Sequence, residues 1–439
     1  MKYFIITYGC QMNEADSDLM AELLHRAGWQ EAGSAEAADL IVLNTCSVRE
    51  RPEHKVYSTL GELRAWKQSN PHALLAVAGC MAQRAGEEIR RRAPHVDLVL
   101  GTRWFHHIHD LVDRVRAGDG PLVMSEMEED PSAARTRPDL AADTAPLRAF
   151  VPVIRGCTNF CSYCIVPLVR GPESSRPAED VVCEVKALVA RGAREVTLVG
   201  QNVLAYGRDL SGGATFPELL RALDPIPDLW RIRFTTSHPR DVTDELVSAM
   251  AELPSVCEHM HLPIQAGEDK LLRDMNRGYT TAQYRAIVDR LRARIPGLAL
   301  TTDIMVGFPG ETEEQFEESL RLYRCIGFDA AFMFAYSPRP GTAAAARDDQ
   351  IPKKLRLERL GRLIEMQNRI TLSRNQAGVG EEAEVLVDGP AHRGEGLLAG
   401  RARNNRQVIF PGDPDMAGSL VRVKLAEAHL WGFRGQLNE

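Results

Sequence analysis

The sequence has no long apolar run and no leader-like start. Nowhere in its 439 residues do 18 apolar residues follow one another, so no segment is long enough to cross a bilayer. Lys2 is followed only by the short run Phe4-Ile5-Ile6 before polar residues begin at Gln11, which is too short for the apolar core of a secretion signal. These absences predict a protein of the cytoplasm with no membrane partner.

The chain also has no excess of positive charge, because its formal net charge is -7. Any nucleic-acid binding must therefore come from a local basic surface. Nine cysteines are an odd number for a disulfide framework, and without a secretion signal they indicate metal or redox chemistry. With 44% hydrophobic residues the chain can bury ordinary cores, and its length suggests roughly two to four domains.

Three cysteines stand close together in the middle of the chain, at Cys157, Cys161 and Cys164. Three thiolates at these spacings can fold around one corner of a cube-shaped iron-sulfur cluster and leave its fourth iron without a protein ligand. Structural zinc is the alternative, but it needs four ligands, and the next cysteine, Cys183, falls in a stretch with a helical pattern. The spacing favours a cluster whose open iron can bind a substrate or cofactor.

A second group of cysteines closes three apolar runs near the N-terminus, at Cys10, Cys46 and Cys80. The runs resemble buried strands, and the helical patterns between them are typical of βαβ units in a parallel sheet. Each cysteine alone would more often be a core residue. Because parallel strands end at one edge, however, the three thiols should converge there. We therefore expect a second cluster, again with three protein ligands.

The rest of the chain divides by composition. An acidic, proline-containing stretch at 125–145 predicts a linker after a first domain, 1–124. From 146 to 375, strands alternate with helix-sized segments, which predicts an open (β/α)6 barrel with its site at the carboxyl ends of the strands. Thr215 and Thr312 each begin a capping box. The predicted strands are 151–154, 195–199, 231–235, 259–263, 299–305 and 330–335.

The C-terminal part has two basic features. A helix from Lys353 to Arg374 is rich in lysine and arginine, and this pattern fits a solvated face or a phosphate contact equally well. Short apolar runs punctuated by glycine then predict a small closed β-barrel of OB-like size at 376–439. Its Arg401, Arg403 and Arg406 would give it a basic surface for RNA.

Taken together, these segments resemble the methylthiotransferase family of radical S-adenosylmethionine enzymes from end to end. The similarity includes the branch of tRNA-2-methylthio-N6-dimethylallyladenosine synthases, and its domains would be an N-terminal Rossmann-like domain, a radical barrel and a C-terminal TRAM barrel. One departure is Ala266-Gly267-Glu268, where the family usually has Ser-Gly-Ser. The motifs that carry the resemblance are Tyr8-Gly9-Cys10-Gln11-Met12-Asn13-Glu14, Asn44-Thr45-Cys46-Ser47 and Arg155-Gly156-Cys157-Thr158-Asn159-Phe160-Cys161.

The resemblance implies an enzyme that methylthiolates C2 of N6-isopentenyladenosine at position 37 of tRNA, next to the anticodon. It implies two 4Fe-4S clusters, one on each group of cysteines, and S-adenosyl-L-methionine bound at the open iron of the Cys157 cluster. Gly200 and Gln201, at the end of the second barrel strand, stand where the superfamily holds the amino group of that cofactor; an ordinary turn would look the same. Expected partners are tRNA, an electron donor such as flavodoxin or ferredoxin, and a sulfur source.

Three other readings stay open at this point. A sibling methylthiotransferase would act on N6-threonylcarbamoyladenosine in tRNA or on an aspartate of a ribosomal protein, and the cysteine spacing alone fits either. A non-enzymatic iron-sulfur electron carrier would need neither the barrel nor the RNA module. A zinc-stabilised RNA-binding protein is the third alternative.

Overall fold

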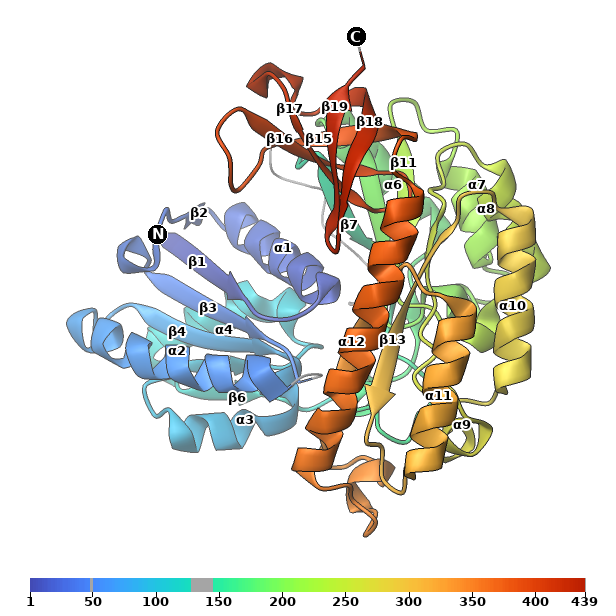
Figure 1. Cartoon of the computed structure of the whole chain (residues 1–439). Helices are drawn as coiled ribbons and strands as arrows, with labels where there is room; N and C mark the ends of the chain where they lie inside the picture. The colour runs from blue at the N-terminus through green and yellow to red at the C-terminus, as the bar shows by residue number, and fades with distance from the viewer. Residues whose placement is uncertain (48–49, 128–144, 439) are drawn as a thin grey trace.

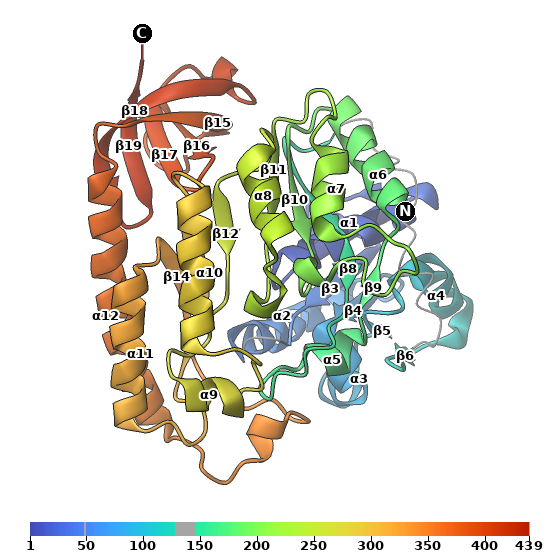
Figure 2. The same ribbon diagram turned by 90° about the vertical axis from the view of Figure 1, so that its right-hand side faces the viewer.

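The chain folds into three parts that lie against one another (Figure 1). In this computed structural model the structure describes residues 1–47, 50–127 and 145–438. An N-terminal sheet lies beside a central barrel, and a small C-terminal barrel covers one end of that central barrel, as Figure 2 also shows. Among the described helices, none is long and apolar enough to span a bilayer.

The N-terminal part is the predicted parallel sheet, with six strands in the order β2-β1-β3-β4-β5-β6. Strands β3 and β4 are buried along their whole length because helices cover both faces of the sheet, which explains their continuous apolar sequences. The elements are β1 (Lys2–Thr7), α1 (Gln11–Arg26), β2 (Gln30–Glu31), β3 (Leu40–Thr45), α2 (Glu50–Ser69), β4 (Leu74–Gly79), α3 (Cys80–Arg92), β5 (Leu98–Leu100), α4 (Ile108–Arg114) and β6 (Leu122–Met124).

The central part is an open barrel of six parallel strands, as predicted. Two three-stranded sheets, β7-β10-β11 and β12-β13-β14, meet at a bridge between Ile232 and Val256, and β7 and β14 remain the outer strands. Most of the linker expected at 125–145 lies outside the described residues. The strands are β7 (Arg148–Pro152), β10 (Glu195–Val199), β11 (Arg231–Phe234), β12 (His259–His261), β13 (Ala299–Val306) and β14 (Ala330–Ala335).

Helices cover the outside of this barrel and begin where the sequence places their caps. Both predicted capping boxes form, at Thr215 with Glu218 and at Thr312 with Gln315, so the first turns of α7 and α11 have partners for their free N–H groups. The helices are α6 (Ala178–Ala190), α7 (Phe216–Leu223), α8 (Asp244–Glu252), α9 (Asp269–Asp274), α10 (Thr281–Arg294) and α11 (Glu313–Ile326).

The C-terminal part is a closed five-stranded barrel reached through one long helix. Helix α12 (Lys353–Ala377) is present as expected, and the barrel runs in the order β15-β16-β17-β19-β18. In Figure 1 the arrow of β13 points away from this barrel, so the C-terminal part covers the end where the central strands begin. Its strands are β15 (Glu382–Pro390), β16 (Leu397–Ala402), β17 (Gln407–Pro411), β18 (Leu420–His429) and β19 (Gly432–Leu437).

Candidate active site

The three N-terminal cysteines lie at one edge of the parallel sheet. Cys10 precedes α1, Cys46 follows β3 directly, and Cys80 begins α3 directly after β4. Two glycines allow the segments that carry these cysteines to approach one another closely. A Cβ on Gly9 would come within 3.0 Å of the Cys46 Cβ, and a Cβ on Gly79, whose φ is +97°, would collide with the backbone of Thr45, the neighbour of Cys46. The predicted convergence of these strand ends is therefore present.

Two buried asparagines fix the backbone beneath these cysteines. Asn13 accepts a hydrogen bond from the Cys10 thiol at 3.4 Å and donates to Asn44 and to the Thr45 carbonyl at 3.1 Å. Asn44 donates in return to the Asn13 carbonyl at 2.8 Å and to Ser17 at 2.9 Å. Both asparagines belong to the motifs noted in the sequence, and the network gives them a role: they join α1 to the end of β3.

The second group of cysteines occupies the loop between β8 (Ile154–Arg155) and α5 (Val166–Arg170). Cys157 and Cys161 are buried and Cys164 is partly buried. Burial raises the pKa of Cys157, and burial followed by the charge of Cys161 raises the pKa of Cys164 to about 12. Raised pKa values favour the protonated forms of Cys157 and Cys164, whereas coordination to a metal would ionise both thiols.

The donor set fits an iron-sulfur cluster. Each group offers three soft sulfur ligands, which iron-sulfur clusters prefer. Among the described residues, no three His, Cys, Asp or Glu side chains surround a single ion position. A cluster does not need such a position, because each thiolate of a four-iron cluster binds a different iron.

A buried arginine that sequence reasoning missed lies beside the second group. Arg277 is 4% exposed and donates to the Cys161 sulfur at 3.3 Å and to the Pro263 carbonyl at 2.9 Å. It comes from the segment after α9, 116 residues further along the chain than Cys161. No spacing pattern in the sequence could have linked the two. A cation at this place stabilises negative charge on the sulfur ligands.

A buried ion-pair triad joins the two cysteine groups. Asp16 on α1 is fully buried and accepts from Arg155 at 2.7 Å and from Arg170 at 2.8 Å. Burial alone would raise the pKa of Asp16, but the charges of Arg170 and then Arg155 lower it. Val169 of α5 and Ile165, the residue just before this helix, also pack against Cys80. The helix that follows one group of thiols therefore contacts the other group directly.

The proposed cofactor-binding residues hold the start of the cysteine loop. The Gln201 side-chain oxygen accepts from the backbone N–H of Gly156 at 2.6 Å, and a Cβ on Gly200 would collide with Ile154. Gly200 and Gln201 therefore lie next to the cysteine loop, and their contact with the cofactor stays a prediction. Nearby, the buried Asn202 Oδ1 and His238 Nε2 find no hydrogen-bond partner in the described part of the chain. Buried polar atoms of this kind fit a polar ligand such as S-adenosylmethionine.

The expected basic surface for RNA is wrong for most of its arginines. Arg403 donates to Glu258 at 2.8 Å and Arg406 to Asp329 at 2.6 Å, so both face the central barrel. On α12, Arg359 is 3% exposed and pairs with Glu311 at 2.7 Å. Glu258 and Asp329 belong to the central barrel, whereas Arg403 and Arg406 belong to the C-terminal one, and Glu311 lies 48 residues before Arg359. These ion pairs hold distant segments of the chain together. Arg401, the third barrel arginine, lines a cavity and donates hydrogen bonds to Asn405, while Asp388 and Glu195 act on its charge from nearby.

Known proteins match this architecture part by part. Residues 2–101 match the family described as "uncharacterized protein family UPF0004", residues 151–323 the radical SAM superfamily, and residues 376–437 the TRAM domain. The solved radical S-adenosylmethionine methyltransferase TsrM from Kitasatospora setae superposes with a TM-score of 0.59 at 13% identity, over 90% of this chain and 79% of that one. The cobalamin-dependent enzyme OxsB superposes at 0.54 and 11% identity, over 84% and 56%. The fold and the Cys157 loop thus define a radical SAM protein.

Relatives of similar length identify the family within the radical SAM class. A tRNA-2-methylthio-N(6)-dimethylallyladenosine synthase of Moorella thermoacetica is 49% identical over 435 residues, covering 99% of this chain and 97% of the relative. One of Carboxydothermus hydrogenoformans is 45% identical over 438 residues, covering 99% of each. The chain belongs to the tRNA-2-methylthio-N(6)-dimethylallyladenosine synthase family.

Proposed function

We propose that this chain is a radical S-adenosylmethionine tRNA methylthiotransferase that places a methylthio group on C2 of N6-isopentenyladenosine at position 37 of tRNA. The names of its full-length relatives support this product. The observation that carries the proposal is the meeting of two thiol groups. The sheet edge with Cys10, Cys46 and Cys80 packs against α5, directly after the Cys157–Cys164 loop.

Each group of cysteines would hold one 4Fe-4S cluster. When bound, the two clusters and S-adenosylmethionine supply the radical chemistry that an unactivated C–H bond requires and the sulfur that replaces the hydrogen. The chain itself places the reactants. Asp16 keeps the two groups facing each other, and Gln201 fixes the start of the loop that carries Cys157.

Further partners follow from the chemistry. Breaking a sulfonium by reduction needs an electron donor such as flavodoxin or ferredoxin, and each product molecule consumes sulfur that a donor must replace. We place the reaction in the cytoplasm, where tRNA is processed. The proposed domains are 1–124 for the second cluster, 125–145 for the linker, 146–375 for the radical barrel and 376–439 for RNA.

Anaerobic reconstitution followed by nucleoside analysis tests the proposal. The wild type should bind about eight irons per chain and convert isopentenyladenosine in tRNA to its methylthio form when given S-adenosylmethionine and dithionite. Cys157→Ala and Cys10→Ala should each lose about half of the iron and all product. The matched control is Cys325→Ala, an exposed cysteine outside both groups, which should keep iron and product.

Other outcomes would overturn the proposal in distinct ways. Zinc in place of iron would refute the cluster assignment. Iron without cleavage of S-adenosylmethionine would indicate an electron carrier, and a methylthio group on threonylcarbamoyladenosine, or on a ribosomal protein, would indicate a sibling enzyme.

A further inference from the structure

A cavity of about 720 Å³ lies where the three parts of the molecule meet. Its wall includes the first residues of two barrel strands, Arg148 and Glu195, together with Gln11 of α1 and Trp431 of the C-terminal barrel. It therefore opens at the end where the central strands begin, which the C-terminal barrel covers in Figure 1. No cysteine belongs to the described residues of this wall. The volume falls in the ~300–1,000 Å³ range of ligand pockets.

Exposed aromatic rings line this cavity. Trp431 stands in the turn between β18 and β19 and is 44% exposed, and its ring lies parallel to that of His429, with 4.9 Å between centroids. Phe332 on β14 is 53% exposed and belongs to the same wall. Exposed aromatic faces on an RNA-binding barrel stack on unpaired bases, because every base offers a flat π face.

The charge of the cavity suits a phosphate. Four arginines and two carboxylates line it, although the whole chain carries a net charge of -7. Arg148, Arg233 and Arg406 each pair with a carboxylate. Arg401 donates to the oxygens of Asn405 at 3.2 and 3.4 Å, and the charges of Asp388 and Glu195 act on it from nearby. Its guanidinium retains donors for a ligand, since arginine has five N–H groups.

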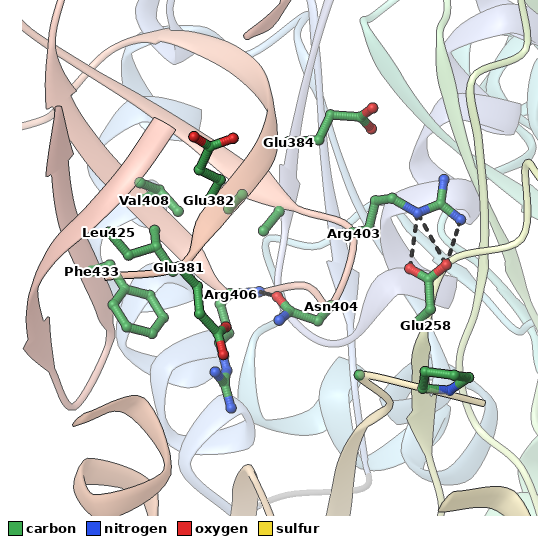
Figure 3. Close-up of a pocket in the computed structure, with 14 residues that line it drawn as sticks. Glu258, Glu381, Glu382, Glu384, Arg403, Asn404, Arg406, Val408, Leu425 and Phe433 are labelled. Atoms are coloured by element: carbon green, nitrogen blue, oxygen red, sulfur yellow. Dashed lines mark hydrogen bonds and ion pairs between the residues drawn. The ribbon is translucent and has the colours of Figure 1, made fainter. Parts of the chain in front are cut away.

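A neighbouring pocket has more acidic than basic side chains in its wall. Figure 3 shows this pocket, which four glutamates and two arginines line and where Glu258 holds Arg403 by paired hydrogen bonds. Asn404 and Arg406, between β16 and β17, belong to the walls of both pockets. Carboxylates repel an RNA backbone. Of these two openings, the one at Trp431 is therefore the one that RNA can enter. The four glutamates are Glu258, Glu381, Glu382 and Glu384.

We propose that the cavity binds one unpaired nucleotide of the RNA substrate, with its base stacked on Trp431 and its phosphate beside Arg401. The inference rests on the proposed function for the class of RNA. It adds a contact with a loop nucleotide close to the target adenosine: the target must reach the cysteines, and the described wall of this cavity extends to Gln11, directly after Cys10, without including a cysteine. A paired base cannot make this contact, since both its faces are stacked inside the helix.

An RNA hairpin with the fluorescent base 2-aminopurine placed at one loop position at a time tests this contact. The reconstituted full-length protein should quench one loop position other than the target. Trp431→Leu should abolish that quenching and weaken hairpin binding about 5- to 150-fold, which is ~1–3 kcal/mol per stacked base at 1.4 kcal/mol per tenfold. Trp431→Phe should retain most of the binding. The matched control is Leu420→Ala on the same barrel, 37% exposed, which should change neither readout.

Two results would overturn the inference: equal quenching and affinity in wild type and Trp431→Leu, or quenching confined to the target adenosine. Nucleoside analysis of the same hairpin separates this test from that of the proposed function. Quenching at a loop position without any methylthio product would leave the stacking contact standing and refute the function. If the Trp431→Leu variant binds the hairpin normally and still forms the methylthio product, the stacking contact is refuted and the proposed function stands.

Discussion

Two histidines inside the central barrel are held neutral by their surroundings. Burial and then the charge of Arg277 lower the pKa of His238 to about 2, and burial and then Arg233 lower the pKa of His259 to about 3. In an unfolded chain such histidines take up a proton near pH 6.5. Their folded pKa values are lower, so their contribution to stability is complete above about pH 6.5 and decreases as the pH falls towards the folded values.

The pH dependence of unfolding should change when one of these rings is removed. Between about pH 6.5 and 5.5 each neutral buried histidine should make the free energy of unfolding fall by up to ~1.4 kcal/mol per pH unit. His259→Gln should therefore show a shallower decrease than the wild type in urea unfolding at several pH values. His392→Gln, in an exposed loop between β15 and β16, is the control. Parallel pH profiles for wild type and His259→Gln would contradict the assignment.

At this scale the sequence predicts candidate cluster ligands better than the residues that hold them in place. Cys157, Cys161 and Cys164 were recognisable because their spacing is local and specific to one chemistry. Arg277 was not, because it reaches Cys161 only through tertiary folding across 116 residues. Asn13 and Asn44 stood in recognised motifs, yet their mutual hydrogen bonds depend on the pairing of α1 with the end of β3.

At the scale of elements, strong local signals decided what could be predicted. The six strands of the central barrel were visible as apolar runs between helical patterns, and all six are present. Strand β19 of the C-terminal barrel has no such signal. Its sequence, Gly432-Phe433-Arg434-Gly435-Gln436-Leu437, has two glycines and little alternation, and its place is set by pairing with β17 and β18.

The cap of α11 offers a test of one such local signal. Thr312→Ala removes the hydroxyl that accepts from the Gln315 N–H, so the free energy of unfolding should fall by about 1 kcal/mol. Thr312→Ser keeps the acceptor and should restore most of it. Denaturant unfolding of the three proteins measures this. A serine variant as unstable as the alanine variant would show that the threonine methyl group, rather than the cap, matters.

At the scale of the whole molecule, ion pairs between distant segments join the parts. Arg155 and Arg170 pair with Asp16 across 139 and 154 residues, and Arg403 pairs with Glu258 across 145. This is why the expected RNA surface on the C-terminal barrel was wrong for Arg403. Sequence composition counts its charge but cannot show that a carboxylate from another domain covers it.

The Asp16 triad predicts a coupling between the cysteine groups. Asp16→Asn keeps the shape but leaves two buried arginines without a countercharge, which costs about 3–5 kcal/mol for a buried pair. We expect lower stability by denaturant unfolding and a larger loss of methylthio product than of iron. Asp18→Asn, exposed on the same helix, is the control. An Asp16→Asn protein with wild-type stability and product would show that the triad is dispensable.

The attachment of the C-terminal barrel to the central barrel bears on which adenosine of the RNA is modified. Arg231, fully buried, donates to the carbonyls of Arg401 and Glu384, and Arg233 donates to those of Arg403 and Ala402. These bonds attach the backbone of the C-terminal barrel to the central barrel, which also carries the Cys157 loop, so the proposed RNA contact at Trp431 is fixed relative to that loop. With one nucleotide held at Trp431, as we propose, the length of RNA strand between Trp431 and the cysteines would determine which adenosine is modified.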